Sequence, residues 1–218
     1  MREFFKRSWL VLVCAFAFGL LLAVTYASWQ PRIERNRILR LQRGIRSILT
    51  DADSIATDTL TIERGGAEMP AVVYTGLDEQ NQPVGYVFAA KGTGFQDRIE
   101  LLVGLGPQLA RYRGIAVLFA AETPGFGDAI RDSVIFKCQF IGTPADSPLN
   151  VVKGPDKDRP KTDDYEIVSI TGATITSEAV TRIVNRRNQE MREALREHTG
   201  QPRSTEQPSR QAAEGEGT

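Results

Sequence analysis

The stretch SITGATITSEAV, Ser169–Val180, crowds hydroxyl side chains around a small Gly-Ala pair. An apolar strand pattern gives way to a helical pattern here, so we expect a strand to end near Ile170 and a helix to begin near Ser177. The first backbone N–H groups of a helix lack intrahelical partners and carry partial positive charge. Because Gly172 and Ala173 leave the backbone open to close approach, this turn can bind a phosphate or another anion.

The hydroxyls of this turn admit two interpretations. In the first, Thr174, Thr176 and Ser177 donate hydrogen bonds to phosphate oxygens at the start of the predicted helix. In the second, Ser and Thr serve only as N-caps, which stabilise a helix by about 1 kcal/mol, and Gly172 only makes the turn. The residues alone leave both interpretations open.

An uncharged segment near the N-terminus, WLVLVCAFAFGLLLAVTYASW at residues 9–29, is long enough to cross a membrane as a helix. Its aromatic ends suit the membrane–water interface. The basic residues that precede it are Arg2, Lys6 and Arg7. The alternative is a cleaved signal peptide, because Thr25–Ala27 resembles a small-residue cleavage site, but the segment is long for one. We expect a retained single-pass anchor.

The charges around the anchor give conflicting signals about orientation. The arginines that follow it are Arg32, Arg35, Arg37, Arg40, Arg43 and Arg46. By the positive-inside rule this excess would keep the C-terminal part in the cytoplasm. Large domains, however, are exported largely regardless of charge. Charge alone therefore leaves the orientation open.

The rest of the chain predicts an α+β fold with a largely antiparallel sheet and flanking helices. Residues 31–49 have helical periodicity and form a linker helix or lie on the membrane surface. The segments expected to form a strand meander are 71–77, 84–91, 98–105 and 114–122. The later elements expected are a short helix and then a strand in 127–142, strands at 148–154 and 165–170, a polar loop at 155–164 and a helix at 177–195.

Composition excludes several function classes. The 27 basic and 27 acidic residues balance, so nothing indicates a nucleic-acid partner. Cys14 and Cys138 lie far apart and predict neither a disulfide nor a thiolate metal site, so we expect no metal. His198 is expected to be a solvated residue near a helix C-terminus. We expect an anchor at 1–30, a linker helix at 31–60, a ligand-binding domain at 61–198 and a disordered tail at 199–218.

Two motifs together resemble those of the covalent FMN-binding domain family. TGATIT at 171–176 matches its flavinylation motif, [ST]-G-A-[ST]-x-T. ETPGFGD at 122–128 is similar to its Glu-Thr-Pro-Gly-Leu-Gly element, with Phe126 in place of the usual leucine. The segment GYVFAAKGTGFQDRIELLVGL at 85–105 also resembles the family. An acidic residue often found a few positions before the threonine motif is absent, since Val168 stands there.

The order of anchor, linker, sheet and motifs resembles the G subunit of the Rnf electron-transport complex. The C subunit of the sodium-translocating NADH:quinone oxidoreductase shares both motifs but usually has a longer spacer between anchor and sheet. The short spacer here, between Trp29 and Thr61, favours the Rnf type.

The resemblance implies a covalent FMN on Thr176, joined through a phosphoester. Other residues that it implies for the flavin site are Thr171, Gly172, Ala173, Thr174, Glu122, Thr123 and Gly125. The first four would shape the phosphate and ribityl site, and the Thr-Pro-Gly turn would lie near the ring system, with Glu122 bonding within its own loop. The alternative for that turn is an ordinary type II turn. We expect no carboxylate pair or histidine beside Thr176, so a separate Mg-dependent flavin transferase would move FMN from FAD to the chain.

The implied function is single-electron transfer within an ion-translocating ferredoxin:NAD oxidoreductase complex in the inner membrane. The implied partners are the other membrane, iron–sulfur and flavin subunits, the flavin transferase and membrane lipid. The soluble domain would face the periplasm, where a covalent bond prevents loss of the flavin by diffusion. No catalytic residue is expected in the chain itself. The alternatives are a subunit of a related quinone reductase, another periplasmic flavoprotein relay, or a non-redox module that binds an anion.

Overall fold

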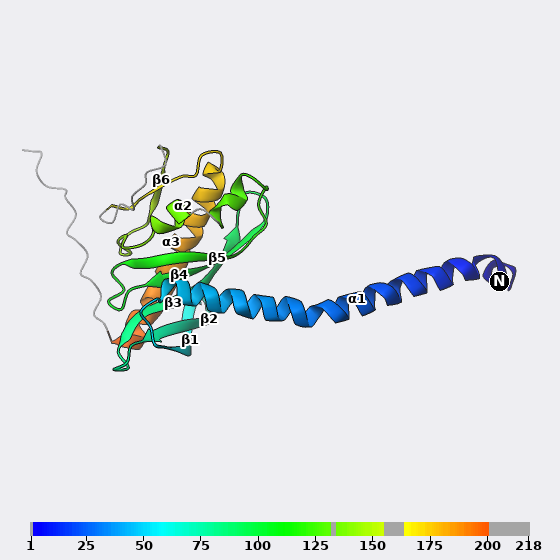
Figure 1. Ribbon diagram of the computed structural model, residues 1–218, viewed down its shortest axis with the longest axis horizontal. Coiled ribbons are helices and arrows are strands. Elements are labelled where there is room, and N and C mark those ends of the chain that lie inside the picture. The colour runs from blue at the N-terminus through cyan, green and yellow to red at the C-terminus, as the bar shows by residue number, and fades with distance from the viewer. Residues whose placement is uncertain (1, 132–133, 155–163, 201–218) are drawn as a thin grey trace, which may run out of the picture.

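The computed structural model describes residues 2–131, 134–154 and 164–200 (Figure 1). The elements, in chain order, are α1 (Arg2–Ile48), β1 (Ser54–Arg64), β2 (Ala67–Leu77), β3 (Pro83–Thr93), β4 (Arg98–Leu105), β5 (Tyr112–Ala120), the 3-10 helix η1 (Gly127–Ile130), α2 (Val134–Cys138), β6 (Asn150–Val152), β7 (Glu166–Val168) and α3 (Thr174–Thr199). The predicted polar loop, except for its last residue, and the tail beyond Gly200 lie outside the described residues.

The five long strands form one sheet in the order β1-β2-β3-β4-β5, and each neighbouring pair is antiparallel. The predicted meander is therefore confirmed. Strands β1 and β2 pair along their whole length and are joined by Gly65 and Gly66, both of which have positive φ, as tight hairpin turns require. Strands β6 and β7 form a separate parallel pair.

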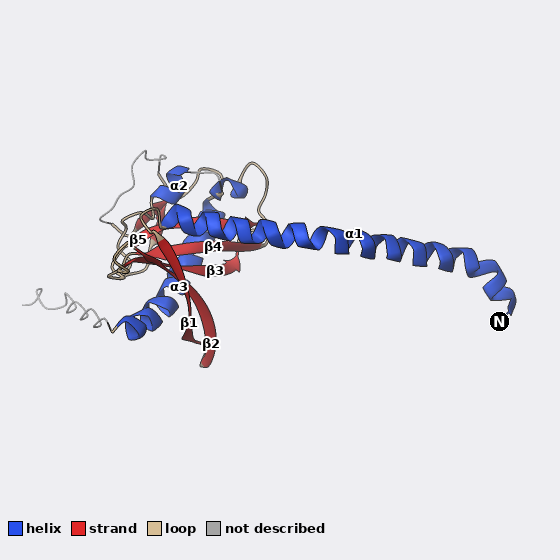
Figure 2. Ribbon diagram, turned by 60° about the horizontal axis from the view of Figure 1, so that its bottom comes forward, coloured by secondary structure: helices blue, strands red, loops and turns tan. Residues whose placement is uncertain are grey.

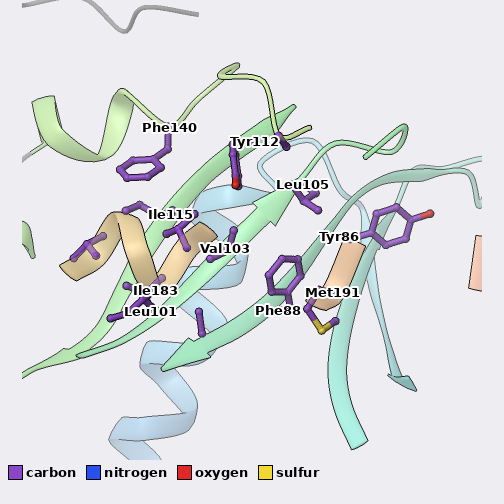
Figure 3. Close-up of a cluster of buried hydrophobic side chains, with 14 of the residues drawn as sticks. Tyr86, Phe88, Leu101, Val103, Leu105, Tyr112, Ile115, Phe140, Ile183 and Met191 are labelled. Carbon is purple, nitrogen blue, oxygen red and sulfur yellow. The ribbon is translucent and has the colours of Figure 1, made fainter. Parts of the chain in front are cut away.

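The sheet is covered on both faces. Alternate residues of each strand point to opposite faces, so Phe88, Leu101 and Val103 pack in the main core together with Ile183 and Met191 of α3 (Figure 3). Residues of the intervening positions, such as Val87 and Leu102, pack against the end of α1. Figure 2 shows α1 crossing the sheet and then extending far beyond the domain. The fold is thus an α+β layer structure with α1 and α3 on opposite faces.

Helix α1 joins the apolar segment and the domain without a break, because it continues through Pro31 to Ile48. It is long and apolar enough to cross a membrane. The predicted linker extended to residue 60, but β1 already begins at Ser54. The segment SIATDTL was missed because β1 is an edge strand and is mostly exposed there, so it lacks the alternating apolar pattern.

The strand predicted within 127–142 is wrong. The short helix α2 is followed by turns, and Arg111 and Pro144 pair only as an isolated bridge. Phe136 in α2 and Phe140 just after it are both buried. Their rings meet edge to face with centroids 5.6 Å apart.

Ile48→Ala is expected to lower the free energy of unfolding by about 2–5 kcal/mol, because it leaves a cavity between α1 and the sheet. Ile48 is 5% exposed and occupies space that a Cβ on Gly104 would overlap. Chemical denaturation of the full chain in detergent micelles measures the effect. Ile38→Ala, on the same helix but 47% exposed, is the matched control and should have little effect. Equal losses in both variants would contradict the docking of α1 on the sheet.

Candidate functional site

Helix α3 begins at Thr174, so the predicted start near Ser177 is wrong. Its N-cap residue is Ala173, which makes no side-chain capping bond, and Gly172 before it has a φ of 80°. The Ser177 hydroxyl accepts a hydrogen bond from the Ile170 N–H at 3.1 Å and donates to the Ala173 carbonyl at 3.0 Å. The Ser177 hydroxyl therefore joins the preceding loop to the helix.

The Thr176 hydroxyl donates a hydrogen bond to Glu122 Oε2 at 2.9 Å. Both residues are buried, with Thr176 3% and Glu122 6% exposed. The other carboxylate oxygen, Glu122 Oε1, accepts hydrogen bonds from the Phe95 N–H at 2.8 Å and the Gln96 N–H at 3.4 Å. We expected Glu122 to bond within its own loop, and this expectation is wrong, because Glu122 links the β3–β4 turn to the start of α3. The sequence was searched only for a carboxylate pair or a histidine beside Thr176, so this single carboxylate was missed.

Two glycines make room for this carboxylate. A Cβ on Gly94 would overlap Glu122 Oε1. A Cβ on Gly127 would lie 2.7 Å from both Glu122 Oε2 and Thr176 Oγ1, closer than such contacts occur in proteins. The backbone therefore encloses the Glu122–Thr176 pair so closely that no side chain fits at either glycine.

A pocket of about 400 Å³ opens beside Thr176. The turn between β3 and β4, the loop after β5 and the first turn of α3 all contribute to it. Three apolar side chains that line it, Phe95, Phe126 and Ile175, are each more than half exposed. Exposed apolar side chains gathered around a few polar groups are typical of a ligand-binding pocket.

The structure brings together six of the predicted site residues. The pocket is lined by Glu122, Thr123, Gly172, Ala173, Thr174 and Thr176. Thr171 and Gly125 are exposed and lie outside the lining. Gly125 has a φ of 79° and the Phe126 N–H donates to the Thr123 carbonyl at 3.2 Å, as the Pro-Gly turn requires.

Phe95 and Ile175 line the pocket and were not predicted as site residues. Phe95 could have been found from its position in the glycine-rich turn GTGFQD. An aromatic side chain in such a turn is not expected to be buried in the core, which leaves a binding role. The signal for Ile175 was its place between two hydroxyl residues of the motif. The arrangement as a whole suits a ligand with a flat apolar part and an anionic end, because the first turn of α3 offers free backbone N–H groups.

Comparison with known proteins agrees with this arrangement. Residues 94–187 match the FMN-binding domain family. The chain is 29% identical over 172 residues to the G subunit of the ion-translocating oxidoreductase complex of Methanosarcina acetivorans, over 78% of this chain and 85% of that one. It is 30% identical over 176 residues to the G subunit of the proton-translocating ferredoxin:NAD(+) oxidoreductase complex of Clostridium ljungdahlii, over 78% and 82% of the two chains.

Among solved structures, that of NqrC from Shewanella oneidensis resembles this chain with a TM-score of 0.53 at 19% identity. The match covers 64% of this chain and 80% of NqrC. At this level of identity the likeness supports the fold alone.

Proposed function

Because the chain belongs to the family of G subunits of ion-translocating oxidoreductase complexes, we propose that it carries FMN covalently on Thr176 and transfers electrons between partner subunits. In this proposal it is a membrane-anchored flavoprotein of an Rnf-type ferredoxin:NAD oxidoreductase complex. When bound, FMN supplies the electron chemistry, and the chain positions it and controls its exposure.

The observation that carries the proposal is the position of the Thr176 hydroxyl. It lies in the first turn of α3 and lines the pocket that Phe95 and Phe126 also line. A phosphate joined to this hydroxyl would lie near the helix N-terminus, which favours an anion by about 0.3–1 kcal/mol. Phe95 and Phe126 offer the flat apolar surface that a flavin ring needs. The residues present therefore fit FMN.

Covalent attachment is tested by flavin fluorescence in a denaturing gel, after co-expression of the chain with a flavin transferase. SDS removes a flavin that is held only by the fold, so a fluorescent band at the mass of the chain requires a covalent bond. A dark band, with the transferase active on another substrate, would contradict the proposal. It would favour instead a module that binds an anion without redox chemistry.

We also propose that α1 spans the inner membrane once and that the domain faces the periplasm. Protease added to spheroplasts is then expected to degrade the soluble domain, while a cytoplasmic marker protein stays intact. Lysed cells, in which both proteins are degraded, provide the control for protease access. A domain that resists protease until the cells are lysed would place it in the cytoplasm and contradict this orientation.

A further inference from the structure

We propose that Glu122 accepts the hydroxyl proton of Thr176 while FMN is attached, so that this chain itself prepares the oxygen that is modified. The inference rests on the proposed function, in which a flavin transferase supplies FMN from FAD. A threonine hydroxyl is a poor nucleophile at neutral pH and needs a base. The structure places a buried carboxylate in contact with that hydroxyl.

Thr176 differs from its neighbours in the direction of its hydroxyl. The hydroxyls of Ser177, Thr181 and Thr199 each donate to the backbone carbonyl four residues earlier in the chain. This is a common local bond for Ser and Thr in helices. The Thr176 hydroxyl instead donates to Glu122, which lies 54 positions earlier in the sequence. The contact is therefore made by the tertiary fold and not by the helix.

The carboxylate is fixed in an orientation that suits a proton acceptor. The Phe95 and Gln96 N–H groups hold Glu122 Oε1, and this leaves Oε2 directed at Thr176 Oγ1. Gly94 and Gly127 provide the space, because a Cβ at either position would meet the carboxylate. A general base must lie about 2.6–3.2 Å from the atom whose proton it takes, and the 2.9 Å separation meets this requirement.

In the proposed step one P–O bond forms and another breaks. Thr176 Oγ1 forms a bond to the phosphorus of the FMN half of FAD, and the diphosphate P–O bond breaks. AMP leaves with the electron pair of that bond, and the hydroxyl proton passes to Glu122 Oε2. The proton then leaves to solvent through the pocket, which Glu122 also lines. In the product Thr176 Oγ1 has no proton to donate, so the contact seen here belongs to the unmodified chain.

The test measures the rate at which a purified flavin transferase, supplied with FAD and Mg²⁺, adds FMN to the full chain in detergent micelles. Intact mass against time gives the rate. Glu122→Gln is expected to react roughly 100-fold or more slowly, the usual range for loss of a general base. Glu178→Gln removes the same charge from an exposed position two residues from Thr176 and is expected to react at the wild-type rate. Thermal melting of each variant reports the integrity of the fold.

The dependence of the rate on pH separates proton transfer from simple positioning. The wild-type rate is expected to fall as the pH is lowered and the carboxylate is protonated. The rate for Glu122→Gln should not show this fall. An ionisation of the transferase itself would affect the rates of the wild type and of Glu122→Gln alike. If Glu122→Gln is too unstable to be tested, Glu122→Asp takes its place. It keeps a carboxylate but displaces it, so FMN attachment should be slow and its rate should still fall at low pH.

Equal rates for the wild type and a folded Glu122→Gln would overturn the inference and leave the proposed function intact. The same holds if Glu122→Asp reacts as fast as the wild type, or if its rate shows no fall at low pH. A wild-type chain that never gains FMN would overturn the proposed function itself. The two failures are therefore distinguishable.

Discussion

Thr176→Ala is expected to abolish covalent flavin attachment, leaving no FMN on the chain by intact mass or in-gel fluorescence. The reason is chemical, since alanine has no oxygen to form the phosphoester. The fold should tolerate the change, because the hydroxyl bonds only to Glu122 among the described contacts of its side chain. Loss of one such buried hydrogen bond costs about 1–3 kcal/mol.

Thr174→Ala is the matched control, since Thr174 is a second hydroxyl in the same helical turn and lines the same pocket. This variant is expected to gain FMN to the wild-type extent. If Thr176→Ala still gains FMN, or if only Thr174→Ala fails to gain it, the flavin is attached to a different oxygen. Either result would contradict the assignment of Thr176.

Gly127→Ala is expected to reduce flavinylation by about tenfold or more and to destabilise the domain. The new Cβ would lie 2.7 Å from both Glu122 Oε2 and Thr176 Oγ1, so one of these side chains must move. Overpacking of this kind costs about 1–3 kcal/mol. A cost of about 1.4 kcal/mol is tenfold in rate if it falls on the reacting geometry. The rate of FMN incorporation and the melting temperature measure the two effects.

Gly106→Ala provides the control for a glycine substitution in this domain. A Cβ at Gly106 would meet only the Arg111 carbonyl oxygen, at an ordinary distance of 3.6 Å. This variant should melt and react much as the wild type does. If Gly127→Ala matched the wild type in both measurements, the close enclosure of the Glu122–Thr176 pair would be disproved.

The parts of the fold that the sequence predicted well are those with strong local patterns. Strand β4, with its run of apolar residues, was predicted with its observed bounds, 98–105. The meander followed from short apolar runs separated by turn residues. The apolar part of α1 was evident because uncharged segments of that length are rare outside membranes.

The parts that failed depend on contacts that no local pattern reveals. Strand β1 lies at the sheet edge with most of its side chains exposed, and it forms because β2 pairs with it. The start of α3 was placed near Ser177 from the change to a helical pattern, whereas the helix begins at Thr174 and its N-cap residue is Ala173. The Glu122–Thr176 contact joins residues 54 positions apart and could be found only from the fold.

The central claim is that Thr176 Oγ1 carries FMN, and peptide mapping by tandem mass spectrometry of the chain purified from its native host tests it most directly. The account predicts that the peptide containing Thr176 carries the mass of FMN less water and that the fragments place this mass on Thr176. An unmodified Thr176 in chain taken from the assembled complex would contradict it.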